Sequence, residues 1–196
     1  MRTGILALSL GGVISAGEAF AQEAAGDPEA GRKVAGMCQT CHGIDGSAQI
    51  PIAPHIGGEP AAYLVGQLRA FRSGERENEM MSVVAKNLTD EQIEDVAAWY
   101  ASHMATAVPP EGFDPAAAPV LCAGCHGEDG IAVVDDVPHL AGENRVYLET
   151  QLKAFRSDQR QHEIMSPIAT ELSEEELGAV VEWFASIGLE VEGPEP

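Results

Sequence analysis

The chain contains the same motif-bearing unit twice. Laid over each other without a gap, residues 38–102 and residues 122–186 agree at about 30 of the 65 paired positions. Both copies begin with a Cys-x-x-Cys-His motif, formed by Cys38, Cys41 and His42 in the first and by Cys122, Cys125 and His126 in the second. A match of this length predicts two tandem copies of one small domain.

The repeat divides the chain into two domains with short flanking segments. We expect a signal peptide at 1–21, an N-terminal domain at 22–103, a linker at 104–115, a C-terminal domain at 116–190 and an acidic tail at 191–196. The linker prediction rests on its prolines and glycine, and the tail is expected to fray. Domains of this size bury only a modest core, and a covalent or metal-based staple commonly supports them.

The first residues have the features of an export signal. Arg2 precedes an apolar run from Ile5 to Ile14, and Ala19-Phe20-Ala21 fits the small-x-small cleavage pattern. The run is too short to span a bilayer, and no later segment is long and apolar enough to do so. We therefore expect a periplasmic protein without a transmembrane segment after cleavage, for which peripheral membrane association stays open. An uncleaved amphipathic anchor is the alternative.

The charge of the chain restricts its partners. With 11 basic and 31 acidic residues, the formal net charge is -20. Such a surface repels phosphate backbones and anionic lipids, which argues against nucleic-acid binding. It favours docking to basic protein patches, although the acidity also has a simpler explanation in solubility.

The hydrophobic pattern predicts an all-α fold. Asp27 before Pro28 indicates the start of a helix that we expect to reach about Gln39. Residues 59–71 and 143–155 carry apolar side chains at helical spacing. Capping boxes predict two further helices, at Thr89-x-x-Gln92 and Ser173-x-x-Glu176. The long stretches between these helices show no strand alternation, which suggests that something other than side chains fills each domain.

The Cys-x-x-Cys-His motif is the attachment sequence of c-type haem. Its two thiols form thioethers with the porphyrin vinyl groups, and the histidine that follows becomes the proximal ligand of the iron. We therefore assign Cys38, Cys41, Cys122 and Cys125 as the haem thioethers and His42 and His126 as axial ligands. A zinc site or two disulfides are alternatives, but neither gives a reason for a histidine after both cysteine pairs. A thioredoxin-like redox pair would need a strand–helix unit, which the sequence lacks.

The second axial ligand is predicted from the repeat. Met81 aligns with Met165, whereas its neighbour Met80 aligns with Ile164. A thioether is a common sixth ligand of haem iron and raises its reduction potential, so we assign Met81 and Met165, in loops, to this role. Core filling is the alternative for a lone methionine. His55 and His139 also recur and are the rival ligands.

Other recurrent residues receive weaker assignments. We expect the carbonyls of Pro54 and Pro138 to accept a hydrogen bond from the proximal histidines, which would leave His55 and His139 beside a haem edge or at the surface. Four recurrent arginines are candidates for the haem propionates or for ordinary surface ion pairs, namely Arg72, Arg76, Arg156 and Arg160. Trp99 and Trp183 are expected to pack in the cores. His103 and His162 have no counterpart and receive no role.

These motifs resemble a known family. Each half is similar to a class I cytochrome c in its Cys-x-x-Cys-His motif, its downstream methionine and the Pro-x-Ile/Leu-x-Gly sequences at 54–58 and 138–142. The whole mature chain resembles the two-haem cytochrome c4 family. The resemblance implies two all-helical domains related by a pseudo-twofold axis, two covalently bound haem c groups, and haem propionates that face each other. His55 and His139 depart from the residues common in such cytochromes.

The resemblance implies an electron carrier rather than an enzyme. Electrons would arrive from a quinol-oxidising complex or another cytochrome and leave to a terminal oxidase. The alternative is the di-haem subunit of a periplasmic dehydrogenase, as in flavocytochrome sulfide dehydrogenases. A haem enzyme would need a displaceable axial ligand, against which the recurrent methionines argue.

Overall fold

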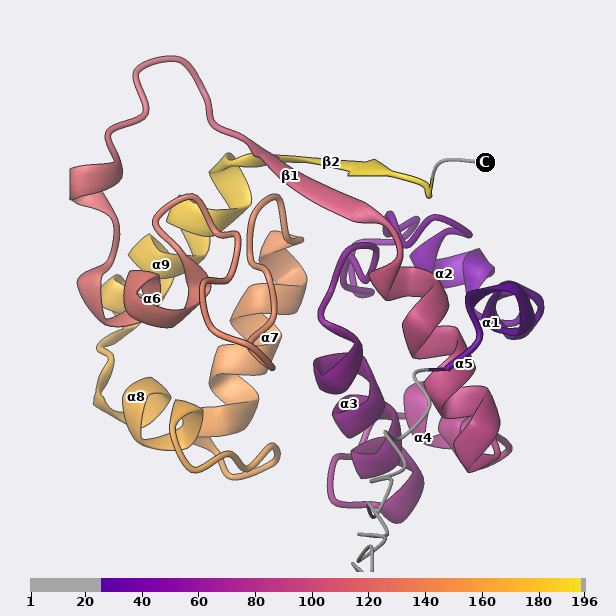
Figure 1. The fold of residues 1–196 in the computed structure, drawn as a ribbon. Coiled ribbons are helices and arrows are strands. Elements are labelled where there is room, and N and C mark those ends of the chain that lie inside the picture. The colour runs from indigo at the N-terminus through magenta and orange to yellow at the C-terminus, as the bar shows by residue number, and fades with distance from the viewer. Residues whose placement is uncertain (1–25, 195–196) are drawn as a thin grey trace, which may run out of the picture.

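The computed structural model describes residues 26–194, and in it two helical domains lie side by side under a two-stranded ribbon (Figure 1). The N-terminal domain contains α1 (Pro28–Ala35), α2 (Gln39–His42), α3 (Ala61–Ser73), α4 (Met81–Ala85) and α5 (Asp90–Ala101). The C-terminal domain contains η1 (Pro115–Ala117), α6 (Val120–His126), α7 (Arg145–Arg156), α8 (Met165–Glu171) and α9 (Glu174–Ser186). The prediction of two helical domains is confirmed.

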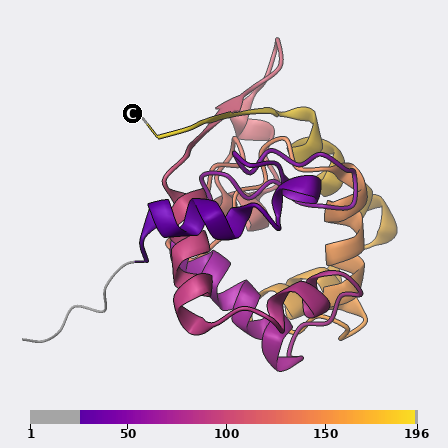
Figure 2. The ribbon, with the colours of Figure 1, turned by 90° about the vertical axis from the view of Figure 1, so that its right-hand side faces the viewer.

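The first helix starts as expected and ends early. The Asp27 side chain accepts a hydrogen bond from the backbone N–H of Glu29 at 2.8 Å, and Pro28 occupies the first turn. The helix ends at Ala35, and a turn at Gly36 separates it from α2, so the expected continuous helix to Gln39 is wrong. Figure 2 shows α1 crossing α5. Gly31 makes this crossing close, because a Cβ there would lie 1.9 Å from the Asp95 carbonyl oxygen.

Both predicted capping boxes are present. At the start of α5, Thr89 Oγ1 accepts from the Gln92 N–H, and the Gln92 side chain accepts from the Thr89 N–H. Ser173 and Glu176 repeat the arrangement at α9. Each box satisfies two N–H groups that the first helical turn leaves unpaired, so these helix starts are determined locally.

Each domain has its own small hydrophobic core. In the N-terminal domain Leu64 of α3 packs with Val96 and Tyr100 of α5. In the C-terminal domain Leu148 of α7 and Phe184 of α9 occupy the corresponding positions. Helices α3 and α5, like α7 and α9, therefore form the rigid wall of each domain. Within residues 26–194, no helix combines the length and the apolar character that crossing a bilayer requires.

The two-stranded ribbon was not predicted. Strand β1 (Met104–Val108) lies in the expected linker and pairs antiparallel with β2 (Gly188–Glu192), which ends the C-terminal domain and includes the first two residues of the expected tail. Inward-facing Ala105 packs on Gly58 and Val191 packs on Gly57, where a side chain on either glycine would overlap them. Strand β2 thus follows the C-terminal domain in sequence but contacts the N-terminal one, and the ribbon straps the two domains together.

Candidate cofactor pockets

Each domain contains one pocket that collects the residues expected to bind a cofactor. Cys38, Cys41, His42 and Met81 line the pocket of the N-terminal domain. Cys122, Cys125, His126 and Met165 line that of the C-terminal domain. Both pockets are concave sites lined mainly by apolar side chains, and both open in part to solvent.

The histidine of each motif is held in one orientation. His42 Nδ1 donates to the Pro54 carbonyl oxygen at 3.0 Å, and His126 Nδ1 donates to that of Pro138 at 2.9 Å. The expected proline contacts are thus confirmed. Burial lowers the pKa of both histidines, which favours the neutral imidazole. With Nδ1 engaged, Nε2 is left as the metal-binding nitrogen.

The two cysteine pairs lie apart, one in each pocket. Their positions therefore do not form a single zinc site that uses all four thiols. Within residues 26–194 all four cysteines are free thiols, and no group of three or more His, Cys, Asp or Glu side chains lies close enough to hold a metal ion. Burial raises the pKa of Cys38 to about 11 and also raises the pKa of Cys122. The donor set in each pocket, two thiols with one imidazole and one thioether, fits haem c.

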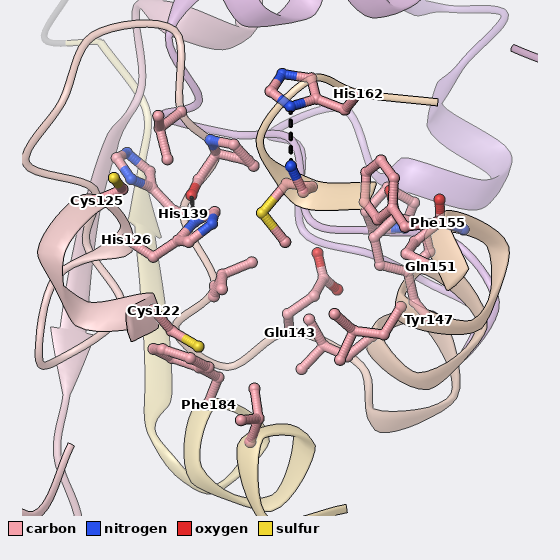
Figure 3. Close-up of a pocket in the computed structure, with 18 of the residues that line it drawn as sticks. Cys122, Cys125, His126, His139, Glu143, Tyr147, Gln151, Phe155, His162 and Phe184 are labelled. Carbon is pink, nitrogen blue, oxygen red and sulfur yellow. Dashed lines mark hydrogen bonds between the residues drawn. The ribbon is translucent and has the colours of Figure 1, made fainter. Parts of the chain in front are cut away.

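The methionines lie at helix starts rather than in loops. Met81 is the first residue of α4 and Met165 the first of α8. Asn78 Oδ1 accepts from the Met81 N–H at 3.0 Å, and His162 Nδ1 accepts from the Met165 N–H at 3.2 Å, the bond drawn in Figure 3. His162, which received no role from the sequence, therefore performs in the second half the task of Asn78 in the first.

Met80 and Ile164 also line the pockets, so position alone does not separate Met80 from Met81. The Met80 side chain is 63 % exposed, whereas Met81 is half-buried. Together with the repeat, this burial favours Met81.

The wall opposite the cysteine motif comes from the second helix of the domain. Figure 3 shows His126, Cys122 and Cys125 on one side of the C-terminal pocket and Tyr147, Gln151 and Phe155 on the other. Six residues line both pockets, namely Pro54, Ile56, Tyr63, Gln67, Tyr147 and Gln151. The two pockets are therefore neighbours that share a wall at the domain interface.

Two arginines cross this shared wall. Arg76 donates to Gln151 at 2.7 Å and to Tyr147 at 3.2 Å, and it lies over Phe71 at 4.4 Å from the ring centroid. Arg160 reciprocates with bonds to Gln67 at 3.0 Å and to Tyr63 at 3.4 Å, and it lies 4.4 Å from the centre of Phe155. Neither arginine pairs with a carboxylate of residues 26–194.

Arg72 and Arg156 behave differently from this pair. They bind Asp90 and Glu174 together with backbone carbonyls at the ends of neighbouring helices. Of the two interpretations from the sequence, ordinary ion pairs therefore describe Arg72 and Arg156.

A second reciprocal contact involves two buried glutamates. The His139 N–H donates to Glu59 at 3.0 Å, and the His55 N–H donates to Glu143 at 3.1 Å. Both carboxyl groups are only 4 % exposed. Desolvation raises the pKa of Glu143 to about 8 and raises the pKa of Glu59 well above its usual value. Sequence reasoning missed this pair, although the identity of the two glutamates across the repeat was an available signal.

The recurrent histidines serve the same interface. His139 Nδ1 accepts from the Ala132 N–H at 3.0 Å, and its Nε2 donates to the Gly58 carbonyl at 3.1 Å. His55 Nδ1 accepts from Ala48 at 3.1 Å, and the ring hydrogen-bonds the backbone of Gly142. Backbone groups therefore occupy the ring nitrogens that an axial ligand would need.

The recurrent tryptophans are half-buried rather than enclosed in the cores. Trp99 Nε1 donates to the Ile44 carbonyl at 2.8 Å, and Trp183 Nε1 donates to that of Glu128 at 3.0 Å. Each indole thereby braces the loop that follows its cysteine motif. Buried His103 has a structural role as well, because its Nδ1 donates to the Trp99 carbonyl at 2.9 Å.

Known proteins match both halves. Residues 26–99 match the family described as cytochrome C oxidase, cbb3-type, subunit III, and residues 118–188 match the family described as cytochrome c. A cytochrome c4 of Pseudomonas aeruginosa is 30 % identical over 181 residues, which cover 84 % of this chain and 90 % of that protein. A thiosulfate dehydrogenase electron acceptor of Stutzerimonas stutzeri is 35 % identical over 170 residues, which cover 77 % of this chain and 79 % of that protein.

Solved structures give the same result. Reduced cytochrome c4 from Pseudomonas stutzeri superposes with a TM-score of 0.72 at 28 % identity, and the match covers 83 % of this chain and all of that one. A thiosulfate dehydrogenase from Marichromatium purpuratum superposes with a TM-score of 0.70 at 31 % identity, over 82 % of this chain and 40 % of that one. The similarity therefore extends over both domains.

Proposed function

Because the chain belongs to the cytochrome c4 family of two-haem electron carriers, we propose that the paired motif residues bind its two covalently attached haem c groups, one in each pocket. Cys38 and Cys41 would attach the first haem, and His42 and Met81 would ligate its iron. Cys122 and Cys125 would attach the second haem, and His126 and Met165 would ligate its iron. The observation that carries this assignment is that one complete set of these donors lines each pocket.

The protein residues adapt this site to electron transfer. Bound haem supplies a one-electron ferrous–ferric couple. His42 and His126 are held by the proline carbonyls, and the Met81 and Met165 backbones are held by the side chains of Asn78 and His162, so the proposed ligands are fixed by the protein. With two protein ligands, each iron would have no position left for a substrate, which suits a carrier.

Arg76 and Arg160 are proposed to bind the haem propionates. Each is a guanidinium at the shared wall with only neutral partners in residues 26–194, and Arg76 is 8 % exposed. A buried cation is stable when an anion compensates it, and guanidinium matches carboxylate in geometry. This assignment places both propionate clusters at the domain interface and favours electron exchange between the two haems.

Membership of this family indicates that the partners are redox proteins but does not identify them. We propose a periplasmic carrier that takes electrons from a quinol-oxidising complex or another cytochrome and passes them to a terminal oxidase. The expected signal peptide at residues 1–21, which lies outside the described residues, supports export.

A periplasmic dehydrogenase is the second candidate donor. Relatives named thiosulfate dehydrogenase electron acceptor match at 35 % and 31 % identity, the second over 95 % of this chain. Stopped-flow reduction by a purified quinol-oxidising complex and by a purified thiosulfate dehydrogenase separates the two. We expect the physiological donor to reduce this protein at a rate that saturates as the concentration of the protein rises. At saturation the rate should match the catalytic turnover of the donor.

Adjacent side chains give a matched test of the ligands. Met81→Ala is expected to remove the near-infrared methionine–ferric absorption of one haem and lower its potential, and Met165→Ala does the same for the other. Met80→Ala and Ile164→Ala are the controls, because they line the same pockets without the proposed ligation. Equal spectral loss in Met80→Ala and Met81→Ala would contradict the assignment.

A further inference from the structure

The surfaces beside the two pockets carry different side chains, although the two domains are copies of one repeat. In the C-terminal domain we define the C-terminal rim as five exposed residues: Val120, Val133, Val134, Asp135 and Asp136. The valines are 83, 69 and 45 % exposed. None of them lines the pocket itself, so their exposure belongs to the outer surface.

These residues gather around the cysteine motif. Val120 begins α6, the helix that carries Cys122 and Cys125. The Val133 N–H donates to the Cys125 carbonyl at 3.0 Å, which holds the segment 133–136 against that helix. Asp136 and Leu121 both line the pocket, so the rim reaches its opening. The rim thus surrounds the side on which the proposed haem is attached.

The N-terminal half lacks this composition. At the aligned positions Gly36 replaces Val120, Gln49 replaces Val133, and Pro51 and Ile52 replace the two aspartates. Ile50 takes the place of Val134, so the first half stays apolar there, and Ile52 is 66 % exposed. What the first half lacks is the apolar side chains of Val120 and Val133 and any acidic side chain at the positions of Asp135 and Asp136. The main difference between the two copies is therefore the pair of acids beside an apolar surface.

We propose that the C-terminal rim is the docking surface for a redox partner whose contact patch is apolar at its centre and ringed by lysine or arginine. An apolar centre with a charged border is the usual composition of a protein interface. The two aspartates, on a chain of net charge -20, select a basic partner and repel anionic lipid. This inference rests on the proposed function, because it assigns a partner to the second haem.

The test measures binding of a basic redox protein to the mature two-haem protein. Mitochondrial cytochrome c, with its lysine-ringed haem edge, is the probe, and the dissociation constant is measured by calorimetry at low and high ionic strength. Asp135→Asn/Asp136→Asn is expected to weaken binding about tenfold at low salt, since two exposed pairs contribute up to about 1 kcal/mol each and 1.4 kcal/mol is tenfold. Asparagine tolerates the positive φ of 65° at Asp136, so the loop is preserved.

A charge-matched variant separates a site from net charge. Glu171→Gln/Glu175→Gln removes two acids on α8 and α9 that do not line the pocket, and we expect less than about a twofold loss. Val133→Gln, which introduces the residue of the first half, is expected to weaken binding about threefold at low and high salt alike.

Each remaining outcome decides the proposal. Equal losses in both double variants, or unchanged binding in Asp135→Asn/Asp136→Asn, would overturn it. Haem content and potentials are measured on the same samples. Loss of haem from the unmutated protein would overturn the proposed function, whereas intact haem with unaltered binding in the aspartate variant overturns the docking surface alone.

Discussion

The two halves keep the same pocket but support it differently. In the N-terminal half α1 packs on α5, with Gly26 and Gly31 against the backbone of Glu94 and Asp95 and the Asp27 N–H bonded to Asp95 at 2.8 Å. In the C-terminal half no α1 equivalent covers α9 within residues 26–194, and its aligned residues Gly178 and Ala179 are exposed. Phe113 from the linker instead packs on Trp183, with ring centroids 5.1 Å apart.

This comparison shows which parts of the repeat are constrained. The cysteine motif, the proline contact, the methionine helix and the interface residues occur in both halves with nearly the same distances. Helix α1, which precedes the cysteine motif, occurs in the N-terminal half only. It packs on a face of α5 that does not line the pocket, so the pocket does not require it. Residues that line the pocket or the domain interface are therefore kept in both halves, whereas residues that cover the outer helix face are not.

The largest expected effect compares the two interface glutamates. A carboxyl whose pKa is raised by folding stabilises the folded state fully below its unfolded value near 4.5 and loses that contribution as the pH rises through the folded pKa. For Glu143 the loss extends to about pH 8, because burial raises its pKa to about that value. Glu143→Gln should therefore match the unmutated protein at pH 4.5 and be more stable at pH 9, as measured by denaturant unfolding.

Glu59→Gln tests whether the two glutamates contribute equally to the pH dependence of stability. The pKa of Glu59 is also raised, by burial and by the nearby Glu143. Glu190→Gln on β2 is the control, because it removes one carboxylate at an exposed position away from the buried pair. An identical pH profile for Glu143→Gln and the unmutated protein would show that the buried pair does not titrate in this range.

The next effect compares the covered outer face of α5 with the aligned, uncovered face of α9, using Gly31 of α1, which packs on α5, and Gly178 of α9. Gly31→Ala should destabilise the protein by about 1–3 kcal/mol, because its Cβ would overlap the Asp95 backbone. Gly178→Ala has open space around it and lies inside α9, so it should stabilise by about 0.5–1 kcal/mol. Equilibrium unfolding measures both changes, and a neutral Gly31→Ala would refute the close packing of α1 on α5.

A smaller effect compares Asn78 with His162. Alanine at either position removes the acceptor for two N–H groups, that of the proposed methionine ligand and that of the residue before it, and should cost about 0.5–2 kcal/mol. We also expect the near-infrared methionine band of that half alone to weaken. His162→Asn restores the residue of the first half and should keep the band. If His162→Asn and His162→Ala lose it equally, the cap does not position Met165.

The smallest effect concerns the two potentials. Residues 22–110 contain 6 basic and 12 acidic residues, and residues 111–196 contain 4 and 18. Negative charge favours ferric iron, so the second haem should have the lower potential, by a difference on the order of tens of mV that shrinks as salt screens it. Haem-resolved redox titration tests this, and a clearly higher potential for the second haem would contradict it.

Part of the site could be predicted from the sequence because its parts are local or repeated. The cysteine motif spans five residues, the capping boxes span four, and the alignment of Met81 with Met165 needs no coordinates. The proline contacts with His42 and His126 were also correct, since they follow from a short loop. Arg72 and Arg76 were indistinguishable in sequence, because what separates them is a partner in the other domain.

The amino-acid sequence by itself determined the duplication, the starts of α1, α5 and α9 and the proposed donors of each pocket, because each of these depends on neighbouring residues or on comparison of the chain with itself. The tertiary structure alone decided the pairing of Glu59 with His139 and of Arg76 with Gln151, the shared pocket wall and the strap of β1 and β2. These contacts join residues 75–88 positions apart, and their free energy is gained only when the folded domains come together.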